Sequence, residues 1–307
     1  MSRLPTAPTP RASVVIVNFN GLRYITACLD SLLRSTAPPT AVVVVDNAST
    51  DGSADTIEAR YPQVTLIRHA ENLGFTGGAN AGIRWCLHAV CDAILLLNPD
   101  AFVEPGAIAT LLAASQRHPR ALIGPRLVPE DTAATFRGCG PSISWWRGRT
   151  TGRLHTAPPS GDVRVDALSG SCLLLPRSAV EDVGYLDDDY FLYCEDMDFA
   201  VRARAAGWEL WIAPGAVVRH RESSATGGPA APLAMYYFVR NRHRFVRKFK
   251  RGRPVYAAFL AYECADVSFR VLRASLEGRL SLARALIRGV IDGWRDVRNR
   301  GRQPFPE

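Results

Sequence analysis

Residues 13–53, SVVIVNFNGLRYITACLDSLLRSTAPPTAVVVVDNASTDGS, contain two apolar, β-branched runs with an amphipathic pattern between them. The runs at 13–18 and 41–46 have the length and composition of buried strands. Helical spacing links the apolar residues between them, which are Leu22, Ile25, Leu29, Leu32 and Leu33, and the pattern stops before two prolines. We therefore expect a strand–helix–strand unit with parallel strands.

The same alternation continues along the chain. Further strands are expected at 64–68 and 93–97, and helices at 53–60, 76–90 and 105–117. Apolar strands separated by helices are typical of a mostly parallel α/β sheet with helices on both faces. Farther on, the sequence predicts a long loop over 129–162, a strand at 171–175, a helix at 195–206, and short strands at 209–212 and 216–219.

The composition is that of an ordinary folded protein. Of the 307 residues 47% are hydrophobic and 21% are charged, which excludes a disordered or collagen-like chain. Seven cysteines form no C-x-x-C pair, so we expect reduced thiols and a cytoplasmic protein. The N-terminal MSRLPTAPTP lacks the apolar run of a signal peptide, and the apolar stretches are far shorter than the ~20 residues of a spanning helix. We expect neither secretion by that route nor a membrane span.

Positive charge is concentrated near the C-terminus. Residues 240–302 hold 17 of the 37 Lys and Arg but 5 of the 29 Asp and Glu, and the Gly-Gly-Pro at 227–229 marks our expected boundary between a catalytic domain, 1–226, and a basic helical tail, 227–307. Over 235–253 one helical face carries Met235, Phe238, Val239, Phe245, Val246 and Phe249.

Such an apolar face bounded by arginines is typical of a helix lying on an anionic membrane surface, and we expect 235–253 to bind there. The alternative for this helix is packing on the catalytic domain. Both interpretations hold equally for a second apolar stripe over 276–294. Arginine-rich helices also bind nucleic acid, but no nucleic-acid-binding motif accompanies this one.

Polar residues follow the predicted strands where each one ends. Ligands of open parallel sheets bind at these carboxyl ends, which here carry NFNG at 18–21, DNASTDG at 46–52 and NPD at 98–100. The glycine-rich run NLGFTGGANAG at 72–82 would let backbone approach a phosphate-bearing ligand. Because it matches neither G-x-G-x-x-G nor a Walker-type loop, a standard dinucleotide dehydrogenase and a P-loop NTPase are disfavoured.

Five motifs in order resemble those of family 2 glycosyltransferases with the GT-A fold, and among them the bacterial rhamnosyltransferase-like group. The motifs are VVIVNFNG (14–21), VVDNASTDGS (44–53), NLGFTGGANAGI (72–83), LLLNPD (95–100) and YLDDDYFLYCEDMDFAVRARAAGW (185–208). The resemblance covers about 13–245 and implies a GT-A nucleotide-sugar-binding fold. It implies inverting transfer of a sugar, with dTDP-L-rhamnose as the favoured donor, to a glycan or polyprenyl-linked acceptor in cell-envelope polysaccharide synthesis. The expected location is the inner face of the cell membrane.

The resemblance assigns Asp46 to the donor base, where a carboxylate can accept a hydrogen bond from a pyrimidine N–H. Asp46 also suits a turn, since its surroundings are rich in turn formers, and both roles can hold together. The resemblance also places Asn80 in the stretch that lines the nucleoside and phosphates, and the alternative is an exposed polar position on a helix. The other residues that the resemblance places around the donor nucleotide are Val17, Phe19, Asn72, Gly77 and Asn98.

The Asn98-Pro99-Asp100 triplet occupies the position of the family's D-x-D metal motif. A divalent cation, Mg²⁺ or Mn²⁺, would neutralise the departing pyrophosphate. Asn98 stands where that motif has its first aspartate, so the site has one negative charge fewer, and Asp100 is the expected direct ligand. His220 matches a histidine that completes the metal site in related enzymes, with an ordinary structural role as its alternative.

Glu195-Asp196 matches the family's E-D motif, in which the aspartate is the general base. An inverting displacement needs a carboxylate within hydrogen-bond reach of the acceptor hydroxyl, which makes Asp196 the candidate; helix capping is the alternative. Arg202 would either pair with a nearby acid or face the diphosphate. Gly170 would border the acceptor cleft, and the run Asp187-Asp188-Asp189 is expected to be a solvated turn.

Two other functions are compatible with a nucleotide-binding α/β fold. One is a nucleotide-sugar pyrophosphorylase or another nucleotidyltransferase, although the glycine-rich Arg/Lys signature of that class is absent after the first strand. The other is a non-catalytic protein that binds nucleotide sugars or RNA. Sugar transfer, pyrophosphate exchange or neither would distinguish the three.

Overall fold

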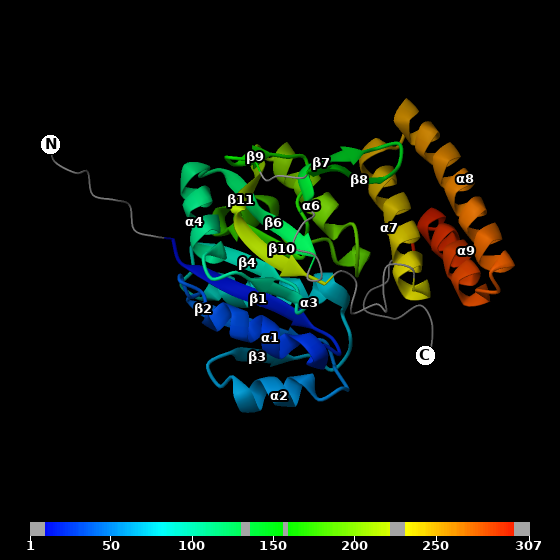
Figure 1. Ribbon diagram of the computed structural model, residues 1–307. Coiled ribbons are helices and arrows are strands. Elements are labelled where there is room, and N and C mark those ends of the chain that lie inside the picture. The colour runs from blue at the N-terminus through cyan, green and yellow to red at the C-terminus, as the bar shows by residue number, and fades with distance from the viewer. Residues whose placement is uncertain (1–9, 130–135, 156–158, 222–230, 298–307) are drawn as a thin grey trace.

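The computed structural model describes residues 10–129, 136–155, 159–221 and 231–297 (Figure 1). A nine-stranded sheet forms its centre. Four parallel strands come first, in the spatial order β3-β2-β1-β4, and they are β1 (Ala12–Asn18), β2 (Ala41–Asp46), β3 (Thr65–Arg68) and β4 (Ala93–Leu97). All four strands of the expected parallel unit are therefore confirmed.

The other half of the sheet is mixed. It continues from β4 in the order β10-β6-β11-β5, with β9 also paired to β11, and the elements are β5 (Ala101–Val103), β6 (Ala121–Pro129), β9 (Val163–Arg164), β10 (Cys172–Pro176) and β11 (Glu209–His220). β10 is antiparallel to both neighbours, whereas β11 is parallel to β6 and antiparallel to β5. The sheet is therefore parallel throughout its β3-β2-β1-β4 half, and the second half adds the parallel pair of β6 and β11.

Helices cover both faces of the sheet. Alternate residues of each strand point to opposite sides, so apolar strands present an apolar surface to each layer of helices. Val14 and Ile16 of β1 join one apolar cluster, and Val15 and Val17 join the other. The first cluster takes in α1 (Leu22–Leu33), α2 (Ser53–Arg60) and α4 (Ala107–Arg117), and the second takes in α3 (Gly74–His88), α5 (Arg177–Val183) and α6 (Glu195–Ala205). The expected helix-covered α/β fold is confirmed.

Two expectations about irregular regions were wrong. The strands expected at 209–212 and 216–219 are one strand, β11, whose register to β6 shifts between Ala213 and Val217. The expected loop at 129–162 contains a hairpin of β7 (Phe136–Ser144) and β8 (Arg149–His155). Its sequence carries Gly, Pro, Ser and Arg instead of alternating β-branched residues, so no period-2 pattern marks it.

Three helices form the C-terminal part, and our expected domain boundary at 227–229 lies outside the described residues. They are α7 (Pro232–Lys250), α8 (Pro254–Leu276) and α9 (Leu280–Trp294). Figure 1 shows α7 beside the α/β part and α8 farther out. Within the described residues no helix combines the length and the apolar character needed to cross a membrane.

The apolar face of α7 is buried inside the protein. Met235 and Val239 pack against α8 and α9, while Phe245 and Val246 pack against Phe259 of α8 and the segment before α6. The expectation that this face inserts into a membrane was therefore wrong. The 19-residue pattern is amphipathic because α7 packs between two parts of its own chain.

The acidic run at 187–189 is not a solvated turn. Asp187 and Asp189 bond cations of α7: Lys248 lies 2.9 Å from Asp187, and Arg244 lies 2.5 Å from Asp189. Part of the tail's positive charge thus holds α7 against the loop that precedes α6.

Candidate active site

A cleft of about 340 Å³ opens at the carboxyl ends of β1 and β4. Strand register explains its position. Asn18 lies opposite Asp46, Cys172 lies opposite Leu97, and His220 of β11 pairs with Ala101, directly after Asp100. Nine of the residues that the sequence singles out line this cleft: Val17, Phe19, Asn72, Asn98, Asp100, Gly170, Glu195, Asp196 and His220.

Asp46 lies behind the cleft and does not line it. Its carboxylate accepts a hydrogen bond from the Asn18 amide (2.7 Å) and another from the Ser49 backbone N–H (3.0 Å), and only 3% of the residue is exposed. The turn-forming role is thus present in the structure. The neighbouring Asn47 lines the cleft and donates to the Gly74 carbonyl over 2.8 Å.

In the glycine-rich run one expected residue, Asn72, lines the cleft, and the other two expected residues do not. Gly74 and Phe75 line the cleft, whereas Gly77 packs on Leu73 and does not. Gly74 has φ +74°, and a Cβ there would lie 2.5 Å from the Phe191 carbonyl oxygen, so no side chain fits. Asn80 is fully buried and bonds Leu186 in both directions, so it is neither a cleft residue nor an exposed helix position.

Asp196 is held at the cleft by backbone donors. The Gly170 N–H donates to one carboxylate oxygen over 3.1 Å, and the Met197 N–H donates to the other over 2.7 Å. Burial raises the pKa of Asp196, while these two hydrogen bonds act in the opposite direction.

Glu195 lies deeper than Asp196. Burial and the adjacent Asp196 charge raise the pKa of Glu195. Among the described residues none donates a hydrogen bond to its buried Oε2. Because Asp196 accepts two backbone hydrogen bonds and Glu195 Oε2 accepts none within the described residues, the negative charge of the pair is better stabilised on Asp196.

Asp100 and His220, which also line the cleft, lie beside each other. His220 Nε2 lies 3.3 Å from Asp100 Oδ1 and 3.4 Å from the Asn98 amide nitrogen. A carboxylate, an imidazole and an amide are ligand types that Mn²⁺ and Mg²⁺ sites use. Since no group of three His, Cys, Asp or Glu side chains gathers within the described residues, a cation here would need further oxygens from the donor diphosphate.

Arg202 points away from this cleft. Its guanidinium donates to Asp198 (2.6 Å) and to the carbonyls of Val183 and Tyr185. Of the two roles that the sequence left open, pairing with a nearby acid is the one found. No Lys or Arg is among the described residues that line the cleft, so positive charge for a diphosphate has to come from elsewhere.

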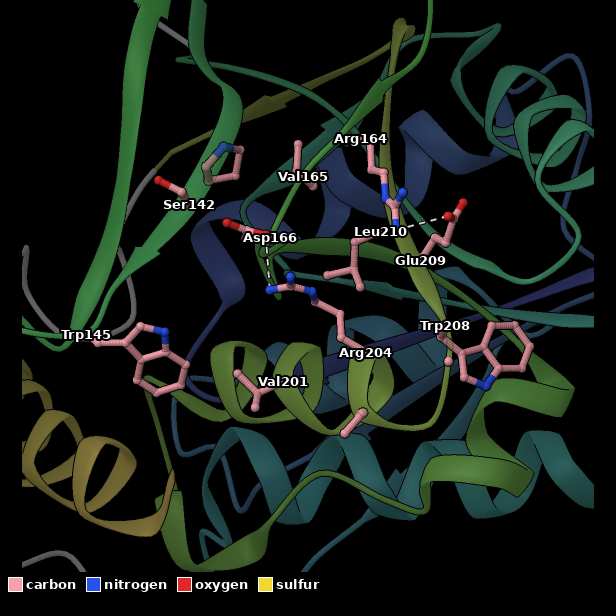
Figure 2. Close-up of a pocket in the computed structure, with 13 residues that line it drawn as sticks. Ser142, Trp145, Arg164, Val165, Asp166, Val201, Arg204, Trp208, Glu209 and Leu210 are labelled. Atoms are coloured by element: carbon pink, nitrogen blue, oxygen red, sulfur yellow. Dashed lines mark ion pairs between the residues drawn. The ribbon is translucent and has the colours of Figure 1, made fainter. Parts of the chain in front are cut away.

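A second cavity, of about 790 Å³, lies between the β7 end, the start of β11 and the C-terminal half of α6 (Figure 2). Figure 2 shows each of its cations beside an acid: Arg164 lies 3.1 Å from Glu209, and Arg204 lies 3.0 Å from Asp166. Its charges therefore cancel locally, which suits neither a diphosphate nor a free general base. We assign the active site to the smaller cleft.

Several lining residues were not singled out from the sequence, although some of them lie within the five motifs. They are Asn47, Phe75, Leu127, Phe191, Leu192, Tyr193 and Leu233. Phe191, Leu192 and Tyr193 lie within the motif that ends in Glu195-Asp196, so their proximity to the site follows from chain continuity. Leu233 belongs to α7, and the expected separate tail gave no reason to place it there.

Comparison with known proteins connects this arrangement to a described family. A sequence model of glycosyl transferase family 2 matches residues 13–184. The chain is 34% identical over 264 residues to an N-acetylglucosaminyl-diphospho-decaprenol L-rhamnosyltransferase of Mycobacterium tuberculosis, covering 75% of this chain and 84% of that protein. It is 22% identical to the dTDP-rhamnosyl transferase RfbF of Shigella flexneri, covering 94% and 97%.

Solved structures share the fold at low sequence identity. The mannosyltransferase PcManGT from Pyrobaculum calidifontis, in complex with GDP-Man and Mn²⁺, superimposes with a TM-score of 0.59 at 17% identity, covering 96% of this chain and 91% of that one. This likeness concerns the fold alone.

Proposed function

The chain belongs to glycosyl transferase family 2, and on that premise we propose that it transfers L-rhamnose from dTDP-L-rhamnose to a hydroxyl of a polyprenyl-diphosphate-linked glycan. It is a glycosyltransferase with the GT-A fold. The observation that carries the proposal is one cleft that is lined by Asp196, Asp100 and His220 together. The rhamnosyltransferase relatives support the choice of donor and of a lipid-linked acceptor.

In this proposal Asp196 removes the proton of the acceptor hydroxyl as that oxygen attacks the anomeric carbon. The Gly170 and Met197 N–H groups orient its carboxylate toward the cleft. Burial and the Asp196 charge raise the pKa of Glu195, so Glu195 is the member of the pair that holds the proton in this proposal and Asp196 is the base.

Asp100 and His220 would hold a divalent cation, Mg²⁺ or Mn²⁺, with the Asn98 side chain beside them. Bound there, the cation compensates the charge that develops on the departing nucleoside diphosphate. Two observations support this proposal. The three side chains are of types that bind such cations, and no Lys or Arg among the described lining residues could compensate the diphosphate charge instead. Val17, Phe19, Asn47 and Asn72 are proposed to surround the nucleoside, with Asp46 orienting Asn18 and the turn behind it.

We place the protein at the cytoplasmic face of the membrane, where a polyprenyl-linked acceptor resides, and assign the contact to the outer face of α8. The exposed residues of α8 between its two ends are uncharged from Ala257 to Leu272 and include Phe269 (65% exposed). Arg251 and Arg253 precede the helix, and Arg273 and Arg279 lie at its other end.

Charge around this face favours an anionic bilayer over a neutral one. Within the described residues 251–297 seven arginines but a single acid, Glu277, are exposed; the arginines are Arg251, Arg253, Arg273, Arg279, Arg284, Arg288 and Arg295. Apolar side chains between cations are suited to insertion among anionic headgroups.

The function is tested by incubating the purified chain with radiolabelled dTDP-L-rhamnose and polyprenyl-diphosphate-linked N-acetylglucosamine. We expect label in the lipid fraction, and none with Asp196→Asn. UDP-glucose, UDP-N-acetylglucosamine and GDP-mannose serve as competing donors in parallel reactions. Transfer from one of these instead would overturn the choice of rhamnose, and pyrophosphate exchange without transfer would favour a nucleotidyltransferase.

A further inference from the structure

The five residues before the Glu195-Asp196 pair have an unusual backbone. The Leu192 N–H donates to the Tyr190 carbonyl over 2.7 Å, and Phe191 between them has φ +65° and ψ −56°. This is a γ-turn of the rarely populated kind. Tyr193 and Cys194 follow with φ +68° and +70°, so three non-glycine residues in this short stretch adopt conformations that side chains disfavour.

A backbone in these conformations persists only where neighbouring groups stabilise it. Here the stabilising contacts come from α7. The Asn241 side-chain amide donates to the carbonyls of Tyr190 (2.8 Å), Leu192 (2.6 Å) and Tyr193 (2.9 Å). Asn241 is fully buried. One side-chain NH2 group therefore bonds three backbone carbonyls. The unusual backbone of this segment points all three carbonyls toward α7.

Two neighbours of Asn241 contact the same segment. Arg240 donates to the carbonyls of Asp189 and Tyr190. The Tyr237 ring stacks on Phe191 with centroids 4.9 Å apart. Phe191 in turn accepts a hydrogen bond from the Thr76 N–H and fills the space beside Gly74. Segment 190–194 therefore connects α7 to the glycine-rich run at Gly74 and Thr76, and it leads directly into the helix that carries Asp196.

We propose that Asn241 is a positioning residue for transfer, since it fixes the backbone of 190–194 and so sets where α6 begins and where Asp196 points. The proposal rests on the assignment of Asp196 as the base. In this proposal α7 determines part of the active-site geometry. Asn241 itself is not among the residues that line the cleft.

Asn241→Leu tests this, because leucine has the same branching and the same number of side-chain heavy atoms but neither N–H donor. We expect kcat to fall about 10²-fold while the KM for the donor stays within about twofold, since a base displaced by about 1 Å loses its alignment without changing the nucleotide wall. Hydrogen exchange of the amides of 190–197 should accelerate, while exchange in β1 and β4 stays unchanged. Asn241→Ser, which keeps one donor, should be intermediate and provides the measurement if the leucine variant does not fold.

Val239→Ala is the matched control, because Val239 is equally buried on α7 but packs toward α8 and α9. It should lower the melting temperature without changing kcat at temperatures where it is folded. Equal losses of kcat in the Val239 and Asn241 variants, or unchanged kcat in Asn241→Leu, would overturn the proposal. If Asp196→Asn retains activity while the exchange of 190–197 still responds to Asn241→Leu, the base assignment is wrong and the backbone restraint stands.

Discussion

The backbone N–H of Gly170 donates a hydrogen bond to Asp196 Oδ2 over 3.1 Å, although 26 residues separate the two in the chain. Gly170 precedes β10, and Asp196 lies in the first turn of α6. Two residues that the sequence assigns to different roles, the acceptor border and the base, are therefore neighbours. If Asp196 is the base as proposed, an acceptor hydroxyl beside it would also lie against Gly170, and substitution of each residue tests its role separately.

Asp196→Asn should reduce kcat by about 10² to 10⁴, because the amide keeps the shape of the carboxylate but cannot accept the proton. Binding of dTDP, measured by calorimetry, should stay within about twofold of the wild type. Glu195→Gln is the comparison: if Glu195 keeps its proton, a glutamine replaces it with a smaller loss. Retention of more than about a third of the turnover by Asp196→Asn would refute the assignment.

Gly170→Ala should raise the KM for the acceptor about tenfold and leave stability unchanged. A Cβ at Gly170 would lie 3.5 Å from Asp196 Cβ and 3.6 Å from Glu195 Oε1, which is ordinary contact, so the protein itself accommodates the methyl group. The methyl group would project into the cleft where the acceptor binds. Gly161→Ala, at an open position with nothing within 4 Å, is the control. A fall in melting temperature with unchanged KM would mean that Gly170 serves packing.

Activity should decline as the pH falls, through a pKa above that of an ordinary aspartate. Burial raises the pKa of Asp196, and a general base works only when ionised, so the loss occurs on the acid side and begins at a higher pH than for an exposed carboxylate. The measurement is kcat/KM between pH 4.5 and 8, with folding followed by circular dichroism. A flat profile over this range in folded protein would contradict an essential base with a raised pKa.

Chelation with EDTA should stop transfer, and Mn²⁺ or Mg²⁺ should restore it. Asp100→Ala should lower kcat by about 10²-fold or more and abolish Mn²⁺ binding in the presence of dTDP, as followed by electron paramagnetic resonance. His220→Ala should weaken that binding. Glu104→Gln, an exposed acid paired with Arg219, is the control. Full activity after thorough chelation would show a metal-independent enzyme, in which Arg202 would have no part because it is bonded to Asp198.

The sheet was predictable where strands are buried on both faces. The β4 run is apolar throughout and the β1 run is apolar from Val14 to Val17, which matches their burial between two helical layers. The β7–β8 hairpin could not be predicted, because its strands lie outside the central sheet and carry polar and glycine residues. The reversal at β10 was also not predictable, since its sequence fits a parallel or an antiparallel strand equally well.

Within the site, motif position predicted nine of the residues that line the cleft, but it also pointed to Asp46, Gly77, Asn80 and Arg202, which do not line it. Asp196, Asp100 and His220 come together because strand and helix ends converge. Arg202 and Asn80 instead bond inside the protein, and nothing in their spacing signals it. The pattern of α7 was ambiguous for a physical reason: an apolar face bordered by cations suits a lipid surface and also a protein surface with acidic loops, here Asp187 and Asp189.

The exposed face of α8 should bind anionic vesicles. Phe269 and Leu272 are 65% and 60% exposed, and inserting them would remove apolar surface from water while each arginine near the surface contributes about 1 kcal/mol. We expect cosedimentation with phosphatidylglycerol vesicles at low salt, less at high salt, and little with neutral vesicles. A double Phe269→Glu, Leu272→Glu variant should lose binding but keep transfer to a short-chain, water-soluble acceptor.

Leu33→Glu, on the 56% exposed Leu33 of α1, introduces a negative charge elsewhere on the surface and should bind as the wild type does. If the α8 double variant and Leu33→Glu bind equally, the face does not contact lipid; if the wild type forms a dimer that the double variant lacks, the face joins two copies of the chain.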